Sequence, residues 1–308
     1  MLPRSIVFVS AAFALLATTG CVKSMIMNGQ IEATRRASVV VDSIEDYELA
    51  RSAAASGITQ LEGMHFLAPD NEDALFMLTK SWTGYATAFP QDDYETAYAN
   101  GDDDVAEYHR RRARRAFEKA IGYGEELLGR HASGYADAKK SPASLRTWLK
   151  SNFTDVEDAA TLFWLGYARL GRIGLFQDET TLLGELFVPV EMLERSRELD
   201  GGYYHASATV VLAAYHARSP MAEMDQARDM FEAALAQTGR KSLNVQVNYA
   251  IQYACKRQDK ALYERLLSEV TREGDPDPTQ RLPNLLARRK AARASTEEAK
   301  RRCGFEFK

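Results

Sequence analysis

Few residues of this chain have the types and spacing that catalysis or metal binding requires. The histidines form no His-Glu-x-x-His motif and no zinc-type pairing with cysteine; they are His65, His109, His131, His205 and His216. The sequence also lacks Gly-x-Ser-x-Gly and the glycine-rich loops that hold phosphates or dinucleotides. We therefore predict no catalytic residue, no metal ligand and no cofactor, and we expect a protein that is not an enzyme.

Cys21 is the residue whose position most clearly indicates a modification. It follows the segment MLPRSIVFVSAAFALLATTG, in which a basic residue, an uncharged apolar stretch and small residues appear in the order of a secretory signal. The small residues before Cys21 resemble a bacterial lipobox, although Thr18 replaces the usual leucine-like residue. We predict a lipoprotein signal peptide over 1–20 and lipidation of Cys21. An ordinary cleaved signal with a chance cysteine is the alternative.

The predicted anchor also indicates a location. Two or three acyl chains, at about 0.8 kcal/mol per buried CH₂, hold a protein stably on a membrane. Val22 stands where an aspartate often signals retention in the inner membrane, so we expect the periplasmic side of the outer membrane. In that oxidising compartment Cys255 and Cys303 are able to pair, but the sequence does not establish the distance between them.

Two oppositely charged clusters follow each other in the first half of the chain. Residues 91–104 are acidic, contain Asn100-Gly101 and lack calcium-loop spacing, so they are predicted to form a solvated loop. The basic cluster, on a helix predicted over about 104–129, comprises Arg110, Arg111, Arg112, Arg114 and Arg115. We predict no nucleic-acid binding, because the signal excludes the cytoplasm and the net charge is −4. The arginines are instead expected to form a solvated face, or to contact lipid headgroups or a protein partner.

Tyr203, Tyr204 and His205 are the candidate ligand-cleft residues. They follow Gly201-Gly202 and open a predicted helix. Aromatic side chains with polar tips are suited to line a cleft and to hydrogen-bond a ligand. The alternative is helix packing with buried hydroxyl groups.

The elements that position these residues are predicted to be helices. Apolar residues recur at helical spacing over 156–168, 243–254 and 262–270, and no segment alternates with a period of two. A start signal at Ser43 and Asp46 opens the first helix after a tether over 21–41. We expect about ten helices, mostly antiparallel neighbours joined by short loops.

Two similar segments favour stacked helix pairs. Ala113-x₃-Phe117-x₂-Ala120 and Ala227-x₃-Phe231-x₂-Ala234 both match the second helix of a tetratricopeptide repeat, in which small residues let helices approach and phenylalanine fills the gap. Residues 42–308 are therefore predicted to form an all-α, TPR-like α-solenoid of stacked antiparallel helix pairs. An irregular all-α bundle is the alternative.

The order of motifs from about Asp46 to Phe307 resembles the TatT component of TRAP transporter systems, a family of periplasmic lipoproteins with a TPR-like fold. The segments that carry the resemblance include MHFLAPDNEDALFMLTKSWTGYATAF, RARRAFEKAIGYGEELL, FWLGYARLGRIGL and LERSRELDGGYYHASATVVLAAYHARSP. The most specific stretch is NVQVNYAIQYACKRQDKALYERLLSEV followed by DPDPTQRLPNLLARRKAA. The chain departs from the family after Pro220, where Met221-Ala222-Glu223-Met224-Asp225 replaces a glycine-rich turn.

The resemblance implies a homotrimer with a central opening and one cleft per subunit, associated with the extracytoplasmic substrate-binding protein of a TRAP system. We therefore expect a non-catalytic accessory lipoprotein that docks the binding protein and passes on a small ligand. A TPR-like envelope scaffold lipoprotein that mediates protein–protein interactions is the main alternative. An enzyme, such as a hydrolase, is a third class that the lack of catalytic motifs disfavours.

Overall fold

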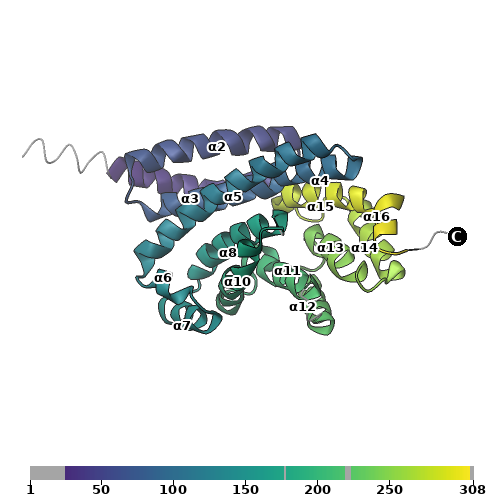
Figure 1. Cartoon of the computed structure of the whole chain (residues 1–308). Coiled ribbons are helices and arrows are strands. Elements are labelled where there is room, and N and C mark those ends of the chain that lie inside the picture. The colour runs from purple at the N-terminus through teal and green to yellow at the C-terminus, as the bar shows by residue number, and fades with distance from the viewer. Residues whose placement is uncertain (1–24, 177, 219–222, 306–308) are drawn as a thin grey trace, which may run out of the picture.

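The structure is a computed structural model that describes residues 25–176, 178–218 and 223–305 (Figure 1). These ranges consist of helices and connecting turns, and none of their residues lies in a β-strand. The predicted all-α class is confirmed. No helix within the described ranges is long and apolar enough to cross a membrane. Cys21 and the predicted signal peptide lie outside these ranges.

The chain forms a helix over 25–37, the 3₁₀ turn η1 (Ser38–Ser43) and then the long helices that contain most of the charged clusters. These are α2 (Tyr47–Leu67), α3 (Glu72–Ala88), α4 (Pro90–Asn100) and α5 (Asp103–His131), followed by α6 (Tyr135–Ala138) and α7 (Pro142–Asn152). The second half begins with α8 (Asp158–Leu175), α9 (Thr180–Gly184), α10 (Phe187–Leu199), α11 (Tyr203–Arg218) and α12 (Met224–Gln237). It ends with α13 (Leu243–Asn248), the π-helical η2 (Tyr249–Ala254), α14 (Lys260–Arg272), η3 (Pro278–Gln280), α15 (Arg281–Ala294) and α16 (Glu297–Arg302).

Capping side chains fix where the first long helices begin. The Asp46 carboxylate accepts a hydrogen bond from the backbone N–H of Leu49 (2.6 Å) at the start of α2. The Asn71 side chain accepts one from the N–H of Ala74 (2.8 Å) at the start of α3. Each bond satisfies a backbone donor that has no partner within the helix. The start signal at Ser43 and Asp46 predicts Ser43 as the N-cap, but the observed N-cap is Asp46, three residues later, because Ser43 belongs to η1.

The predicted solvated loop over 91–104 is wrong. Residues Pro90–Asn100 form α4, and only the turn around Gly101, with φ of 80°, interrupts the helical backbone before α5. Proline is well tolerated at the first helical position, and the acidic side chains of Asp92 and Asp93 favour the helix N-terminus. In addition, Asp92 is buried rather than solvated, because two arginines of α15, which is distant in the sequence, neutralise it.

The described part of the predicted tether is helical and packs on the domain. Ile31 of the 25–37 helix is fully buried. The Arg35 guanidinium pairs with Asp73 and lies 4.4 Å from the centre of the Phe76 ring. Residues 25–43 are therefore attached to α3 by apolar, ionic and cation–π contacts.

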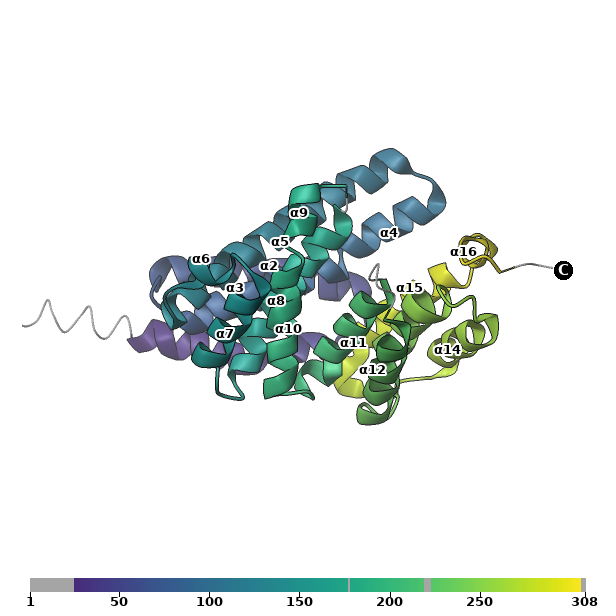
Figure 2. The ribbon, with the colours of Figure 1, turned by 60° about the horizontal axis from the view of Figure 1, so that its bottom comes forward.

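Antiparallel neighbours stack into a curved row of helices. α3 packs on α5, α8 on α10, and α11 on α12, and Figure 2 shows α8, α10, α11 and α12 side by side. Phe117 and Phe231 are both fully buried, which confirms their predicted place in the core. The Phe117 ring occupies the space left by Gly171, where an added Cβ would overlap the ring. Phe231 stacks on Tyr249 with ring centres 4.9 Å apart.

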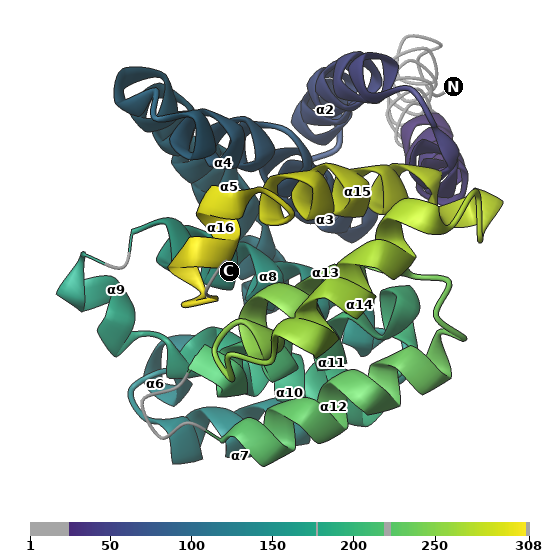
Figure 3. The same cartoon turned by 90° about the vertical axis from the view of Figure 1, so that its right-hand side faces the viewer.

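The C-terminal helices return to the beginning of the chain. α15 contacts η1, α2 and α4, and Figure 3 shows it lying across these early elements. A disulfide between Cys255 and Cys303 joins the residue after η2 to the residue after α16, with Cα atoms 4.9 Å apart. The pairing that the sequence left open is therefore present, and it closes a loop that contains α14 and α15.

Candidate functional site

Tyr203, Tyr204 and His205 lie at the start of α11, where the backbone takes an unusual path. The φ angles of Tyr204, His205 and Ala206 are 45°, 59° and 58°, so three successive non-glycine residues adopt the left-handed conformation. Each costs of the order of 1 kcal/mol or more, and such residues persist only where surrounding contacts hold them. The neighbouring elements must therefore determine this turn.

The two tyrosines are held by residues from α8 and η1. The Tyr203 hydroxyl accepts a hydrogen bond from the Trp164 indole N–H (2.9 Å), and the Tyr204 hydroxyl donates to Asp42 Oδ1 (3.2 Å). The Trp164 and Tyr204 rings meet edge to face with centres 4.9 Å apart, and the Phe163 and Tyr203 rings are 5.7 Å apart. All three candidate residues keep partial exposure to solvent. Ring packing and ligand contact are therefore both compatible with their positions.

Partly buried charges surround this turn. Lys80 of α3 places Nζ 5.9 Å from the centre of the Trp164 ring. Burial lowers the pKa of Lys80 and raises the pKa of Asp42, and the attraction between the two charges opposes both shifts. Burial also lowers the pKa of His205, against the attraction of Asp277 and Asp42. We call Asp42, Lys80, Trp164, Tyr203, Tyr204 and His205 the aromatic cluster.

The aromatic cluster combines an amine, a carboxylate, an imidazole and two phenols beside rings that meet edge to face or at a tilt. Such groups can hydrogen-bond the polar atoms of a small ligand while the rings cover its apolar part. Sequence reasoning missed Asp42 and Lys80, which come from η1 and α3 and have no local motif. Only the fold brings them to the start of α11.

A separate groove with a volume of about 440 Å³ lies between α7, α10 and the C-terminal end of α11. It is lined by Arg146, Leu149, Lys150, Phe187, Val190, Glu191, Glu194, Arg195, Glu198, Tyr215, His216 and Glu223. The three candidate cleft residues do not line it. Its charges are largely paired: Arg146 Nε lies 2.8 Å from Glu191 Oε2, and Lys150 Nζ lies 3.3 Å from Glu198 Oε1. This polar surface offers many hydrogen-bonding groups, and we call it the α7–α10 groove.

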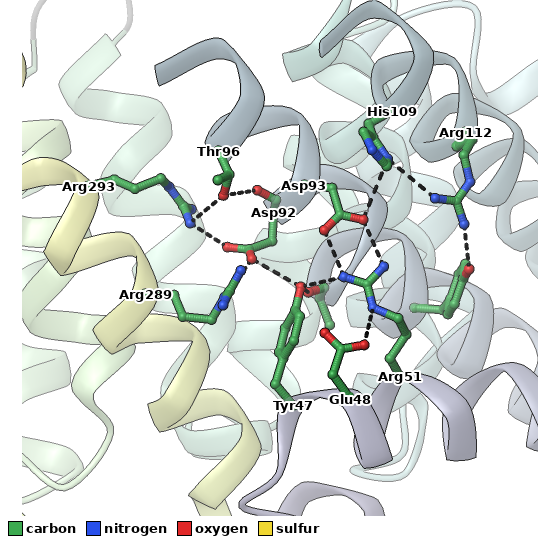
Figure 4. A network of polar contacts seen from close by, with 12 residues as sticks. Tyr47, Glu48, Arg51, Asp92, Asp93, Thr96, His109, Arg112, Arg289 and Arg293 are labelled. Carbon is green, nitrogen blue, oxygen red and sulfur yellow. Dashed lines mark hydrogen bonds and ion pairs between the residues drawn. The ribbon is translucent and has the colours of Figure 1, made fainter. Parts of the chain in front are cut away.

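A third polar assembly joins helices α2 and α4, from the early part of the sequence, to α15, from its last part (Figure 4). The buried carboxylate of Asp92 accepts hydrogen bonds from Arg289 Nε and Arg293 Nη1, both at 2.7 Å, and from the Tyr47 hydroxyl at 3.1 Å. Beside it, Asp93 receives two hydrogen bonds from Arg51, at 2.7 and 2.8 Å. We call Tyr47, Asp92, Arg289 and Arg293 the Asp92 network. It attaches α4 to α2 and α15. Arg293 Nη2 also donates to Glu95 Oε2 at 2.7 Å, so two carboxylates face the two arginines.

Comparison with known protein families identifies the chain. A family model described as the TRAP transporter T-component matches residues 44–300. The chain belongs to the TRAP transporter T-component family. The match spans nearly all of the described helical domain and confirms the resemblance seen in the sequence. It indicates an accessory role in a TRAP transporter, in a family that is generally not enzymatic. A search of curated proteins finds no match to this chain.

Two of the five clustered arginines of this T-component, Arg110 and Arg114, contact other parts of its own fold, whereas Arg111 and Arg115 are exposed. Arg110 Nη2 lies 2.7 Å from Asp178 Oδ1, and Arg114 Nη1 lies 2.5 Å from Glu179 Oε1. Both guanidinium groups also lie over the Phe176 ring, at 4.2 and 4.5 Å. These contacts attach α5 to the segment after α8.

Clusters that could bind a metal are absent from the described part of this T-component. Its residues contain no group of three or more histidine, cysteine, aspartate or glutamate side chains that could hold an ion. His216 instead places Nδ1 2.5 Å from Glu223 Oε2 in the α7–α10 groove. His131 contacts the backbone, with Nε2 2.7 Å from the carbonyl oxygen of Asn152.

Proposed function

We propose that this T-component is a non-catalytic periplasmic lipoprotein that docks the substrate-binding protein of its TRAP system and passes on a small ligand. The family match over residues 44–300 carries the proposal, because it assigns the chain to such a transporter. The proposal includes lipidation of Cys21, location at the outer membrane and assembly as a homotrimer. It also includes the absence of catalysis.

The disulfide supports an oxidising compartment. Structural disulfides form and persist in the periplasm and are rare in the cytosol. Cys255 and Cys303 are close enough to be bonded, and the sequence begins with a segment that has the order of an export signal. Both observations agree with a protein that functions outside the cytoplasm.

Two regions of the domain suit the two parts of this function. The α7–α10 groove presents paired charges and a few apolar side chains, a combination typical of a polar, reversible protein interface. The aromatic cluster, with Tyr203, Tyr204 and His205, suits contact with a small ligand. We assign docking to the α7–α10 groove and ligand contact to the aromatic cluster.

Sedimentation of the soluble domain with its cognate binding protein tests the docking. A domain that lacks residues 1–21 should sediment as a trimer and gain mass when the binding protein is added. Glu198→Arg reverses a charge in the groove. It should lower the free energy of binding by at least about 0.5–1 kcal/mol, the contribution of one charge pair at the rim of an interface. Glu297→Arg, on exposed α16, is the matched control and should leave the complex intact.

The envelope scaffold is the second candidate function. A domain that stays monomeric, and ignores the binding protein with and without its ligand, would favour the scaffold. A gene for a TRAP binding protein or permease beside the gene for this chain would favour the transport role.

Mass spectrometry tests the anchor separately. The mature N-terminal peptide should begin with an acylated Cys21, and Cys21→Ser should release the protein from membranes. A free amino terminus at another residue would contradict the lipidation.

A further inference from the structure

Four large apolar side chains are exposed near the first described residue. They are Met25 and Ile26, at the start of the 25–37 helix, and Phe66 and Leu67, at the C-terminal end of α2, with exposed fractions of 69, 64, 83 and 66%. Single exposed apolar residues are common, but several large ones gathered at one end of a molecule suit contact with something apolar. We call these four residues the apolar end patch.

Contacts of neighbouring residues place both halves of the patch at one end of the molecule. Asn71, in the turn after α2, donates from Nδ2 to Asn28 Oδ1 at 2.9 Å, one helical turn from Met25. Arg130, near the end of α5, donates to the carbonyl oxygen of Pro69 at 2.8 Å. Figure 1 shows the 25–37 helix beginning at the end opposite the turn between α4 and α5. Since α5 has 29 residues, about 43 Å separates these two ends.

The covalent chain limits how far this end can lie from the predicted anchor. Four residue steps separate Cys21 from Met25, which corresponds to at most about 14 Å of fully extended chain. The polar headgroup layer of a bilayer is itself about 5–8 Å thick on each side. An acylated Cys21 would therefore hold Met25 and Ile26 close to the lipid surface, whatever path the connecting residues take.

We propose that the apolar end patch rests on the lipid bilayer, with its four side chains in the interfacial layer. This inference rests on the proposed lipidation of Cys21. The acyl chains supply most of the affinity, and the patch adds apolar contact that fixes the orientation of the domain. The turn between α4 and α5 then points away from the membrane.

A charged neighbour limits the depth of insertion. Asp70 is fully exposed beside the patch, and its Oδ1 lies 3.6 Å from Arg130 Nη1. A carboxylate is costly in the hydrocarbon core but is tolerated among headgroups. The patch therefore contacts the interface without entering the centre of the bilayer.

Tryptophan quenching by brominated lipids tests the orientation. Full-length protein carrying Phe66→Trp is reconstituted into phosphatidylethanolamine–phosphatidylglycerol vesicles, with and without bromine on the acyl chains. Residue 66 is highly exposed, so the larger ring fits. Tyr98→Trp, near the end of α4 at the opposite end of the domain, is the matched control. The parent chain, with Trp82, Trp148 and Trp164, gives the background.

We expect bromine to quench the tryptophan at position 66 and to leave the one at position 98 unchanged. Protein that floats with the vesicles without quenching at position 66 would overturn the orientation and leave the anchor intact. Protein that fails to float would overturn both the anchor and this inference. Protection of position 66 from iodide in the vesicle-free oligomer would show a contact between copies of the chain and would also overturn the inference.

Discussion

Asp92 is a single carboxylate on which three helices converge. Its oxygens receive hydrogen bonds from Tyr47 of α2 and from Arg289 and Arg293 of α15, and the carboxylate is almost completely buried. Removing one member of a buried ionic network leaves the remaining charges desolvated and unpaired. The position therefore matters more for stability than its place in an acidic stretch of sequence suggests.

Asp92→Asn should lower the free energy of unfolding by about 3 kcal/mol, the lower end of the range for broken buried pairs, because both arginines keep some access to water. Urea denaturation measures the change. Asp104→Asn, at an exposed position of α5, is the control and should change stability by about 0.5 kcal/mol. Equal effects of the two substitutions would contradict this role of Asp92.

Phe117 is a second residue whose contribution to stability can be predicted, in this case from the contact between its ring and Gly171. Its ring fills the space above Gly171 and is inaccessible to solvent, so Phe117→Ala leaves a cavity. The expected loss is about 3–5 kcal/mol. Val105→Ala, half-exposed on the same helix, should cost below about 0.5 kcal/mol. A loss below about 1 kcal/mol for Phe117→Ala would contradict the packing described for α5 and α8.

At the scale of the element, the left-handed turn that opens α11 holds a histidine in a partly buried position. Burial lowers the pKa of His205 below its ordinary value of 6.5. The folded protein then binds fewer protons than the unfolded chain as the pH falls through about 6.5, so the free energy of unfolding decreases in that range. Stability at neutral pH does not depend on this protonation.

His205→Asn should reduce the loss of stability on acidification. Asparagine tolerates the left-handed conformation and has no titrating group, so the turn is kept and the proton linkage is removed. Denaturant titrations between pH 5 and 8 compare the variant with the parent. Above about pH 7.5 the two curves should run parallel, because imidazole is neutral there in both states. Parallel curves over the whole range would contradict the linkage.

The elements show clearly what the sequence was able to predict. The buried positions of Phe117 and Phe231 depend on helical periodicity, which is a local property. The start signal at Ser43 and Asp46 predicted the first long helix, but its N-cap is Asp46 and not Ser43. The loop predicted over 91–104 was wrong although Pro90 and the acidic first turn are local signals for a helix. The burial of Asp92 was missed because the partners that neutralise it are about 200 residues away. Asp42 and Lys80 were missed for the same reason. Local patterns identify helices, and long-range contacts decide which charges they bury.

At the scale of the whole molecule, the disulfide supports the contact between the first and last helices. Cys255 and Cys303 are 48 positions apart, and the loop between them contains both arginines of the Asp92 network. Closing a loop of this length restricts the unfolded chain and is worth about 4 kcal/mol in the chain-entropy description. The bond and the network therefore stabilise the same region.

The free energy of unfolding of the double variant Cys255→Ser and Cys303→Ser should be about 4 kcal/mol lower than that of the oxidised parent. Hydrogen exchange should become faster in α15 and α16, because these elements lose their covalent attachment. Reductant should weaken the parent and leave the double variant unchanged. Equal stability of the oxidised and reduced parent would contradict the contribution of the bond.

The Asp92 network also has a consequence for the order in which the chain is made. A polypeptide emerges from the ribosome with its N-terminus first, so Asp92 appears long before Arg289 and Arg293, which follow it by 197 and 201 positions. Until they arrive, the carboxylate keeps its hydration, and helices α2 and α4 cannot bury it without a large electrostatic cost. The N-terminal half is thus kept from completing its packing early, and the final compaction of the domain waits for its last helices.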